Sequence, residues 1–289
     1  MEKENNMVGK LYLVATPIGN LEDITFRAVR ILKEADMIAA EDTRNSIKLL
    51  NHFEIKKPMT SYHEFNRFDK ADVLIDKLKE GCTIALITDA GTPGISDPGE
   101  VLVEKCVEEG IPVIPVPGAV AGINALIASG QKTGRFVFEA FLPQDKKERN
   151  EILDNLKEET RTIIIYEAPH RLLKTLTLLE EALGRDRSIT ICKEITKKHE
   201  SFVKTRLCDA VELYSSGTEE PRGEYVLVIA GRSRREIEEE NRNKWESISI
   251  EDHLKKYIEE GHTKKEAVKL VAEERGIPKR DVYAVSIEL

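Results

Sequence analysis

The chain has 289 residues, more than a single compact core usually holds, so its length predicts two domains with room for a small appendage. Its formal net charge of -8 excludes a protein that holds naked nucleic acid by charge alone, since neutralising phosphates takes clustered Lys and Arg. No apolar run approaches the roughly 20 residues that span a bilayer, and the first residues lack the apolar core of a secretory signal, so we expect a cytoplasmic protein without a membrane partner.

The first half of the chain alternates short apolar runs with amphipathic segments. The runs predict strands at residues 10–15, 37–40, 83–88 and 112–116. Helices are predicted at residues 25–35, 47–50, 69–80, 101–109 and 119–129, with Asp23 as a nearby cap for the first. Continuous apolar strands that alternate with helices predict a largely parallel sheet covered on both faces.

A polar, glycine-flanked stretch at residues 129–134 is the candidate domain boundary. Beyond it, strands are predicted at residues 136–141, 162–166, 188–193 and 225–230, and helices at residues 147–158, 172–183 and 206–214. A short strand around residues 200–204 would pair within this sheet and make part of it antiparallel.

The last part of the chain has a different composition. The charge-dense residues 232–244 predict a solvated linker or an exposed helix. Two amphipathic segments at residues 250–259 and 264–274 then predict a small helical tail of helix-turn-helix type, an arrangement that also occurs without nucleic acid. The expected fold is therefore α/β, with domains at residues 8–130 and 131–232 and a helical tail at residues 245–289.

Three loops follow predicted strands of the first domain. The strongest is DAGTPGISDPG at residues 89–99, and TPIGN (16–20) and VPGAVA (116–121) have the same placement. Ligands of parallel sheets bind outside the carboxyl ends of the strands, so these loops predict a rim that cradles a small molecule. The small residues at Gly118 and beyond suit either the close approach of a flat ring or tight helix–sheet packing, and both interpretations stay open.

Common motifs limit the choice of ligand. The sequence contains neither GxxxxGK[ST] nor GxGxxG after the first strand, although Glu41 and Asp42 lie where a ribose-binding acid would follow, which leaves a nicotinamide enzyme as a rival. His63, His170 and His199 share no ligand spacing with a second His or Cys, and no CxxC is present, so we expect neither a metal nor a disulfide.

An ordered set of motifs gives the chain a family resemblance. Between residues 10 and 231 it reads LYLVATPIGNLEDIT, AAEDTR, LITDAGTPGISDPG, VPGAVAGINAL, FEAFLP, YEAPHR, KEITKKHE and GEYVLVI. With these motifs it resembles the tetrapyrrole-methylase superfamily and, within it, the small-subunit ribosomal RNA (cytidine-2'-O-)methyltransferase I family. The resemblance implies two α/β domains of tetrapyrrole-methylase type, S-adenosyl-L-methionine in the cleft between them, a homodimer, and methylation of a cytidine ribose in 16S ribosomal RNA.

The resemblance also implies which residues bind the cofactor. Matched motif by motif, they are Pro17, Gly19, Asp89, Ala90, Gly91, Thr92, Pro93, Ile95, Ser96, Asp97, Pro117, Gly118, Phe141, Glu167, Ala168, Gly223 and Glu224.

The expected reaction needs orientation more than covalent chemistry. The ribose oxygen must attack the methyl group in line, and a carboxylate or a neutral lysine could accept the hydroxyl proton. Our candidates for base, phosphate clamp and orienting groups are Asp42, Arg44, Lys193 and Glu194. A basic cluster for RNA is expected at Lys193, Lys197, Lys198, Lys204 and Arg206, and the acidic background predicts recognition of a shaped small-subunit ribonucleoprotein.

Two rival functions stay open. The same fold could methylate a tetrapyrrole or a protein side chain. Alternatively the chain could be a non-catalytic RNA-binding module, with the tail as its binding element.

Overall fold

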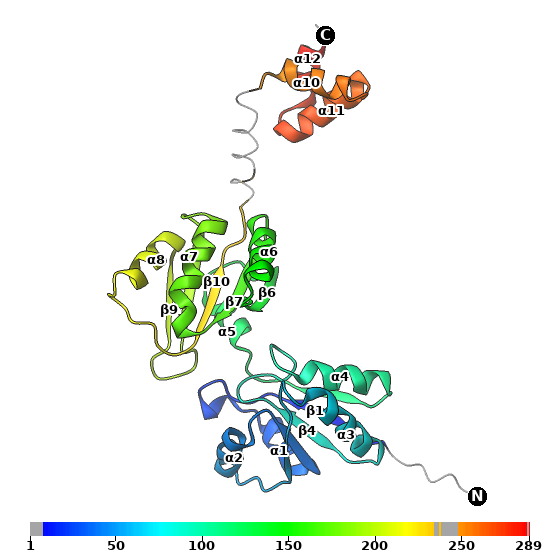
Figure 1. Cartoon of the computed structure of the whole chain (residues 1–289), viewed down its shortest axis with the longest axis vertical. Helices are drawn as coiled ribbons and strands as arrows, with labels where there is room; N and C mark the ends of the chain where they lie inside the picture. Colours follow the sequence, from blue (N-terminus) through cyan, green and yellow to red (C-terminus); the bar gives the residue numbers. More distant parts are fainter. Residues whose placement is uncertain (1–7, 234–236, 238–247, 288) are drawn as a thin grey trace, which may run out of the picture.

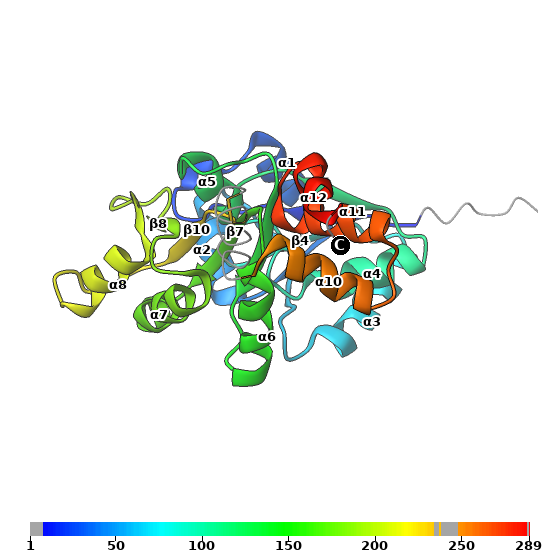
Figure 2. The same cartoon turned by 90° about the horizontal axis from the view of Figure 1, so that it is seen from above.

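The computed structural model describes residues 8–233, 237, 248–287 and 289. These residues form two five-stranded sheets, each with helices packed against it, followed by a group of tail helices (Figures 1 and 2). The linker expected at residues 232–244 lies almost entirely outside the described residues. Within the described part, no helix is both long enough and apolar enough to cross a membrane.

The first sheet is parallel throughout, with strand order β3-β2-β4-β1-β5. Its strands are β1 (Leu11–Val14), β2 (Met37–Ala40), β3 (Met59–Ser61), β4 (Ile84–Ile87) and β5 (Val113–Val116). Its helices are η1 (Leu21–Asp23), α1 (Phe26–Glu34), α2 (Thr43–His52), α3 (Arg67–Lys79) and α4 (Gly99–Glu108). The predicted parallel sheet is confirmed, and β3 is an additional strand.

Side chains that alternate along the strands bury both faces of this sheet. Leu11 and Leu86 pack with α3 and α4, whereas Val14 and Ile87 pack with α1 and α2. Because all five strands run the same way, their carboxyl ends and the loops that follow them emerge at one edge.

The predicted cap of α1 is wrong. Asp23 lies in the short helix η1, and Thr25 caps α1 through its hydroxyl, which accepts a hydrogen bond from the Ala28 N–H at 3.0 Å. Threonine suits this position because its side-chain oxygen replaces a helical carbonyl that the first turn lacks.

The second sheet has the order β6-β7-β10-β8-β9. Its strands are β6 (Phe136–Phe141), β7 (Thr162–Glu167), β8 (Ser188–Lys193), β9 (Ser201–Arg206) and β10 (Tyr225–Ile229). Only β6 and β7 pair in parallel, and the other three pairings are antiparallel. The expected strand near residues 200–204 is confirmed as β9, and the antiparallel part extends further than expected because β10 inserts between β7 and β8.

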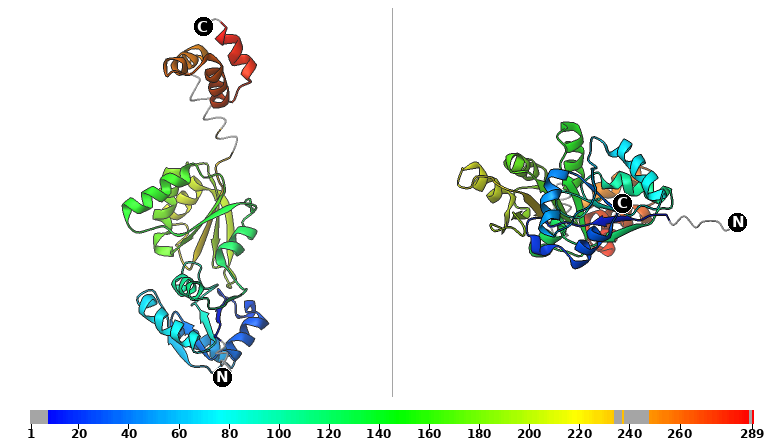
Figure 3. Two further views of the ribbon diagram at one scale, coloured as in Figure 1. Left: turned by 90° about the vertical axis from the view of Figure 1, so that its right-hand side faces the viewer. Right: turned by 90° about the horizontal axis from the view of Figure 1, so that it is seen from below.

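The two faces of the second sheet have different covers. The helices α6 (Lys146–Lys157), α7 (Leu172–Leu183) and α8 (Leu207–Ser215) pack on one face around Ile165 and Leu227. The helix α5 (Ala121–Ala128) packs on the other face, where Ala125 and Leu126 join Ile164 and Val228 (Figure 3). By its contacts α5 therefore goes with the second sheet, although it precedes the expected boundary at residue 130.

The tail contains three helices rather than the expected two. They are α10 (Ile250–Glu259), α11 (Lys264–Arg275) and α12 (Lys279–Ser286), packed around Leu254, Val271 and Val282. Thr263 and Glu266 form a capping box at the start of α11, and Gly276 ends that helix in the left-handed conformation with φ 62°.

Candidate functional site

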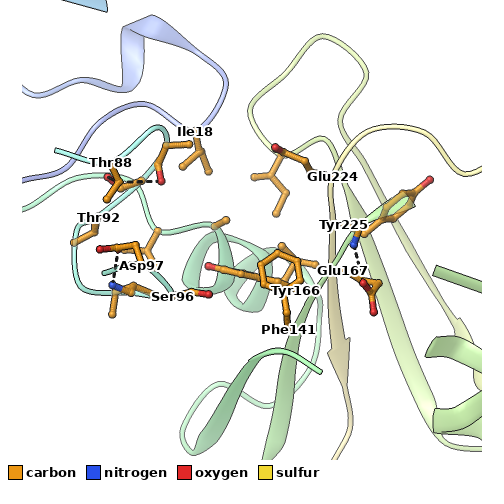
Figure 4. A pocket seen from close by; sticks show the side chains of 18 of the residues that line it. Ile18, Thr88, Thr92, Ser96, Asp97, Phe141, Tyr166, Glu167, Glu224 and Tyr225 are labelled. Atoms are coloured by element: carbon orange, nitrogen blue, oxygen red, sulfur yellow. Dashed lines mark hydrogen bonds between the residues drawn. The ribbon is translucent and has the colours of Figure 1, made fainter. Parts of the chain in front are cut away.

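A cavity of about 380 Å³ lies between the carboxyl edge of the first sheet and the second sheet. Figure 4 shows side chains of the two units facing each other across it. Its volume is within the roughly 300–1,000 Å³ of small-molecule sites. It is lined by Ile18, Glu41, Thr88, Ala90, Gly91, Thr92, Ile95, Ser96, Asp97, Val120, Ala121, Phe141, Tyr166, Glu167, Ala168, Pro169, Ile195, Glu224, Tyr225 and Val226.

The three loops predicted to form a rim are joined by hydrogen bonds. Thr16 and Gly91 form an isolated antiparallel bridge, with N–H to carbonyl distances of 2.8 and 3.2 Å. The Thr92 hydroxyl donates to the Ala119 carbonyl at 3.0 Å. The rim is therefore held in place before any ligand binds, which lowers the ordering cost of binding.

Asp97 organises the glycine-rich loop from within. Its carboxylate accepts hydrogen bonds from the backbone N–H groups of Gly94, Ile95 and Gly99, at 2.8 to 3.1 Å. The path between them passes through positive φ at Gly94 (88°) and Ser96 (63°). Because only glycine tolerates such values without strain, a charged side chain that fixes the turn offsets part of the cost at Ser96.

The wall from the second domain is also internally braced. The buried Glu167 carboxylate accepts hydrogen bonds from the Ala168 N–H at 2.9 Å and the Thr175 hydroxyl at 2.5 Å, and it pairs with Arg171. The Tyr166 hydroxyl accepts from the Gly122 N–H at 2.9 Å, which ties α5 to this wall. The Glu167 carboxylate is thus already hydrogen-bonded and ion-paired within its own domain, and its role at the cavity is to fix the shape of this wall.

Carboxylates gather on the wall from the first domain. Burial raises the pKa of Glu41 above its ordinary value, a hydrogen bond from the Asp89 N–H acts against this, and the charges of Asp89, Asp97 and Asp42 raise it further. A cation bound in the cavity would relieve this repulsion. Apolar side chains such as Ile18, Val120 and Ile195 supply flat contact area, so the cavity suits a small ligand with a ring and a positive charge.

The predicted cofactor residues divide into two groups. Those that line the cavity are Ala90, Gly91, Thr92, Ile95, Ser96, Asp97, Phe141, Glu167, Ala168 and Glu224. Those outside its lining are Pro17, Gly19, Asp89, Pro93, Pro117, Gly118 and Gly223.

Packing accounts for several glycines of the second group. A Cβ added to Gly118 would lie 2.6 Å from the Cβ of Ala15, and one added to Gly223 would lie 2.4 Å from the Glu194 side chain. Gly223 also has φ 79°. Of the two interpretations that the sequence left open for Gly118, the contact with Ala15 supports tight packing.

Several lining residues were not among the predicted cofactor or catalytic residues, although Ile18, Val120 and Ala121 lie in the loops expected to form the rim. They are Ile18, Glu41, Thr88, Val120, Ala121, Tyr166, Pro169, Ile195, Tyr225 and Val226. Most of them adjoin a predicted residue, and Glu41 directly follows the end of β2, which is where the parallel-sheet rule places ligand contacts.

The four proposed catalytic residues lie outside the lining of the cavity. Hydrogen bonds from the Arg44 side chain and backbone hold the pKa of Asp42 at about 2. A hydrogen bond to Glu219 raises the pKa of Lys193, so its amine stays protonated. Burial opposes ionisation of Glu194, yet hydrogen bonds from Lys197 and the Glu224 N–H lower its pKa. Asp42 and Lys193 are therefore poor proton acceptors near neutral pH.

The expected basic cluster is largely neutralised. Lys193 pairs with Glu219, Lys197 with Glu194 and Glu224, and Arg206 with Asp186 and Asp209. Lys204 donates to the Gly130 carbonyl at 2.8 Å. Among the described residues, no group of three His, Cys, Asp or Glu side chains is placed to hold a metal.

Comparisons with known proteins agree with this architecture. Residues 10–211 match the family model described as Tetrapyrrole (Corrin/Porphyrin) Methylases. The chain is 50% identical to the Ribosomal RNA small subunit methyltransferase I of Synechocystis, over 98% of this chain and 99% of that protein. It is 45% identical to the protein of the same name from Thermotoga maritima, over 78% of this chain and 100% of that protein.

A solved structure shares the fold. The uroporphyrin-III C-methyl transferase of Thermus thermophilus, complexed with S-adenyl homocysteine, superposes with a TM-score of 0.55 at 20% identity, covering 77% of this chain and 97% of that one. Sequence and fold together place this chain in the tetrapyrrole (corrin/porphyrin) methylase family and, within it, among the ribosomal RNA small subunit methyltransferases I.

Proposed function

We propose that this chain transfers the methyl group of S-adenosyl-L-methionine to the ribose 2'-oxygen of a cytidine in small-subunit ribosomal RNA. The observation that carries the proposal is the 50% identity to a ribosomal RNA small subunit methyltransferase I over nearly the full length of both chains. The cytidine and its 2'-oxygen are the part that rests on the resemblance of the motifs.

The cavity suits this cofactor. Ile18, Val120 and Ile195 provide apolar walls for an adenine ring, and the carboxylates around Glu41 complement an ammonium and a sulfonium charge. The S-adenyl homocysteine in the solved structural relative supports the same choice. When bound, S-adenosyl-L-methionine supplies the electrophilic methyl carbon.

The protein's part in the reaction is mainly placement. The loop braced by Asp97 and the Thr16–Gly91 bridge fix one wall, and the wall around Glu167 fixes the other, so that the acceptor oxygen can be aligned for in-line attack. Glu41 suits the role of proton acceptor better than Asp42, because it lines the cavity and its pKa is raised rather than lowered. Asp42, Arg44, Lys193 and Glu194 remain proposed orienting groups.

The test is methylation of undermodified small ribosomal subunits with labelled S-adenosyl-L-methionine, followed by mapping of the labelled nucleotide by mass spectrometry. We expect one labelled cytidine, with the label on its ribose. Label on a base would overturn the assignment of the 2'-oxygen. Turnover with a tetrapyrrole or a protein, and none with ribosomal RNA, would favour a rival acceptor.

Assembly and location are part of the same proposal. We expect a cytoplasmic homodimer, and an apolar patch supports an interface, because Phe26 and Leu21 line one hollow and are 99% and 42% exposed in the single chain. Sedimentation equilibrium of the full chain measures the assembly state, and a monomer at micromolar concentration would contradict the dimer.

A further inference from the structure

A second hollow of about 270 Å³ lies behind one wall of the cofactor cavity. Its lining includes Pro17, Gly19, Asn45, Lys48 and Asp89. Of these, Pro17, Gly19 and Asp89 are predicted cofactor residues that do not line the cofactor cavity. The wall between the two spaces is one loop thick, because Ile18 lines the cavity whereas its neighbours Pro17 and Gly19 line the hollow.

The hollow lies at the boundary with the second domain. A Cβ added to Gly19 would lie 2.5 Å from the Lys197 Cγ and 2.9 Å from the Thr196 hydroxyl oxygen. A ligand in the hollow would therefore lie beside the cleft, where an acceptor strand must enter to reach the methyl group.

The polar groups on its floor are fixed in place. Asp89 accepts hydrogen bonds from the Asp42 N–H at 3.2 Å and from the Asn45 side chain at 2.9 Å. Each carboxylate oxygen of Asp89 thus has a donor within the protein. The apolar faces of Pro17 and Leu49 complete a site with one polar and one apolar side.

Lys48 supplies the positive charge. Its side chain is exposed at the hollow, and within the described residues it makes no ion pair, unlike most cations of the expected basic cluster. It follows Arg44 by one turn of α2, so the two cations share a helix face at roughly 5–6 Å between Cβ atoms. Arg44 is paired with Asp42 and does not line the hollow, so Lys48 is the cation that a ligand there would meet. A cation beside an apolar wall suits the phosphate and sugar of a nucleic acid.

We infer that this hollow is a subsite for one nucleotide of the RNA acceptor, with Lys48 bound to its phosphodiester. The inference rests on the proposed function and adds the place and chemistry of acceptor binding. In this arrangement the Thr16–Asn20 loop contacts both ligands: Ile18 faces the cofactor, and Pro17 and Gly19 face the RNA.

The experiment compares the full-length Lys48→Ala, Lys48→Arg and Lys77→Ala variants. Lys77 is the matched control because it is an exposed lysine near the end of α3, toward the amino ends of the strands. Steady-state methylation of undermodified small subunits should show a KM for subunits raised about tenfold in Lys48→Ala, because a charge-assisted hydrogen bond to phosphate is lost. The kcat should stay near that of the wild type, as expected when uniform binding is lost.

Salt dependence gives a second readout. The slope of log KM against log salt concentration should fall by about one in Lys48→Ala, because one phosphate contact is lost. Lys48→Arg and Lys77→Ala should keep the wild-type KM and slope.

The outcomes separate this inference from the proposed function. If the wild type methylates ribosomal RNA and Lys48→Ala keeps its KM and salt slope, the subsite is overturned while the function stands. A weakened affinity of Lys48→Ala for S-adenosylhomocysteine in calorimetry would assign the hollow to the cofactor and also overturn the subsite. Absence of RNA methylation by the wild type would overturn the function itself.

Discussion

The environment of Glu41 lowers the stability of the folded protein, whereas the proposed function gives this residue a role in the reaction. Its carboxyl is half-buried beside three other acids, and burial first and the neighbouring charges next raise its pKa above the ordinary 4.5. Ionising it in the folded protein therefore costs more than ionising it in the unfolded chain. Such a stability cost agrees with the role of proton acceptor proposed for Glu41, since activity is often maintained at the expense of stability.

We predict that Glu41→Gln makes the protein more stable near neutral pH and less active. Below pH 4.5 the Glu41 carboxyl is protonated in both folded and unfolded states, so the two proteins should have similar free energies of unfolding. As the pH rises through the raised folded pKa, wild type should lose stability relative to the variant. The kcat should fall by roughly 10²-fold or more if Glu41 accepts the proton.

Urea unfolding of both proteins from acid to neutral pH measures the first effect, and steady-state methylation, which gives kcat, measures the second. Glu104→Gln on the exposed side of α4 controls for the loss of one surface charge. A wild-type kcat in Glu41→Gln would remove Glu41 as the proton acceptor.

We expect Asp97 to affect cofactor binding through the backbone of the glycine-rich loop. Its carboxylate holds three N–H groups of the glycine-rich loop, so Asp97→Ala leaves a loop with positive φ at Gly94 and Ser96 without its brace. We expect the dissociation constant of S-adenosylhomocysteine to rise about tenfold or more, since charged hydrogen bonds contribute roughly 1.5–3 kcal/mol and about 1.4 kcal/mol is a factor of ten. Isothermal titration calorimetry provides the measurement, and an unchanged affinity would show that the loop keeps its path without the carboxylate.

At the scale of elements, periodicity predicted the long segments well and the short ones poorly. Buried runs such as β4 and β10 are apolar at every position, which is the signature of a strand covered on both faces. The strand β3 has the sequence Met-Thr-Ser and is only partly buried, so it contains no apolar run from which a strand could be predicted. Its pairing with β2 is a tertiary effect that a local pattern does not contain.

The placement of α5 shows the same limit. Its small apolar residues predicted a helix, which the structure confirms, but nothing in the spacing says which sheet it covers. That choice depends on the fit of Ala125 and Leu126 against Ile164 and Val228, which lie far away in sequence.

A substitution at Gly118 can test how closely the connection between β5 and α5 must approach the end of β1. A methyl group on Gly118 would meet the Cβ of Ala15 at 2.6 Å, inside van der Waals contact. We predict that Gly118→Ala destabilises the protein by about 1–3 kcal/mol, the usual cost of overpacking. Gly134→Ala is the control, because a Cβ there meets no atom within 4 Å. Equal free energies of unfolding for the two variants would argue against the packing interpretation of Gly118.

For the whole molecule, the sequence predicts one side of the site better than the other. The first-domain wall follows from a rule, because loops after parallel strands converge at one edge, and Gly91, Thr92 and Asp97 line the cavity there. The opposite wall depends on how two separately formed sheets face each other. Tyr225 and Val226 reach the cavity because β10 lies centrally in the second sheet, and its place there is set by long-range pairing.

The tail forms a core from its own residues, which include Leu254, Val271 and Val282. The relative from Thermotoga maritima aligns in full with only 78% of this chain, so the family fold exists at a shorter length. We predict that a chain ending at residue 233 folds and binds S-adenosylhomocysteine with an affinity within about twofold of the full chain, as expected for independent units. Circular dichroism and calorimetry test this, and loss of folding would mean that the tail completes the core.

Electrostatics of the whole chain predict which form of the acceptor it modifies. The net charge is -8, and Lys193, Lys197 and Arg206 are held in ion pairs, so the expected basic cluster offers little net positive charge to a free polyanion. A few contacts such as the one proposed for Lys48 give weak binding unless the shape of a folded acceptor adds to them.

We predict that undermodified small subunits are methylated at least about 100-fold more efficiently, by kcat/KM, than a short naked RNA with the same target sequence, a difference of roughly 2.7 kcal/mol. Both substrates should be compared at one salt concentration, because the weaker one is the more salt-sensitive if charge alone drives its binding. Equal efficiency for the two would mean that the protein reads the local sequence, and recognition of an assembled ribonucleoprotein would then be wrong.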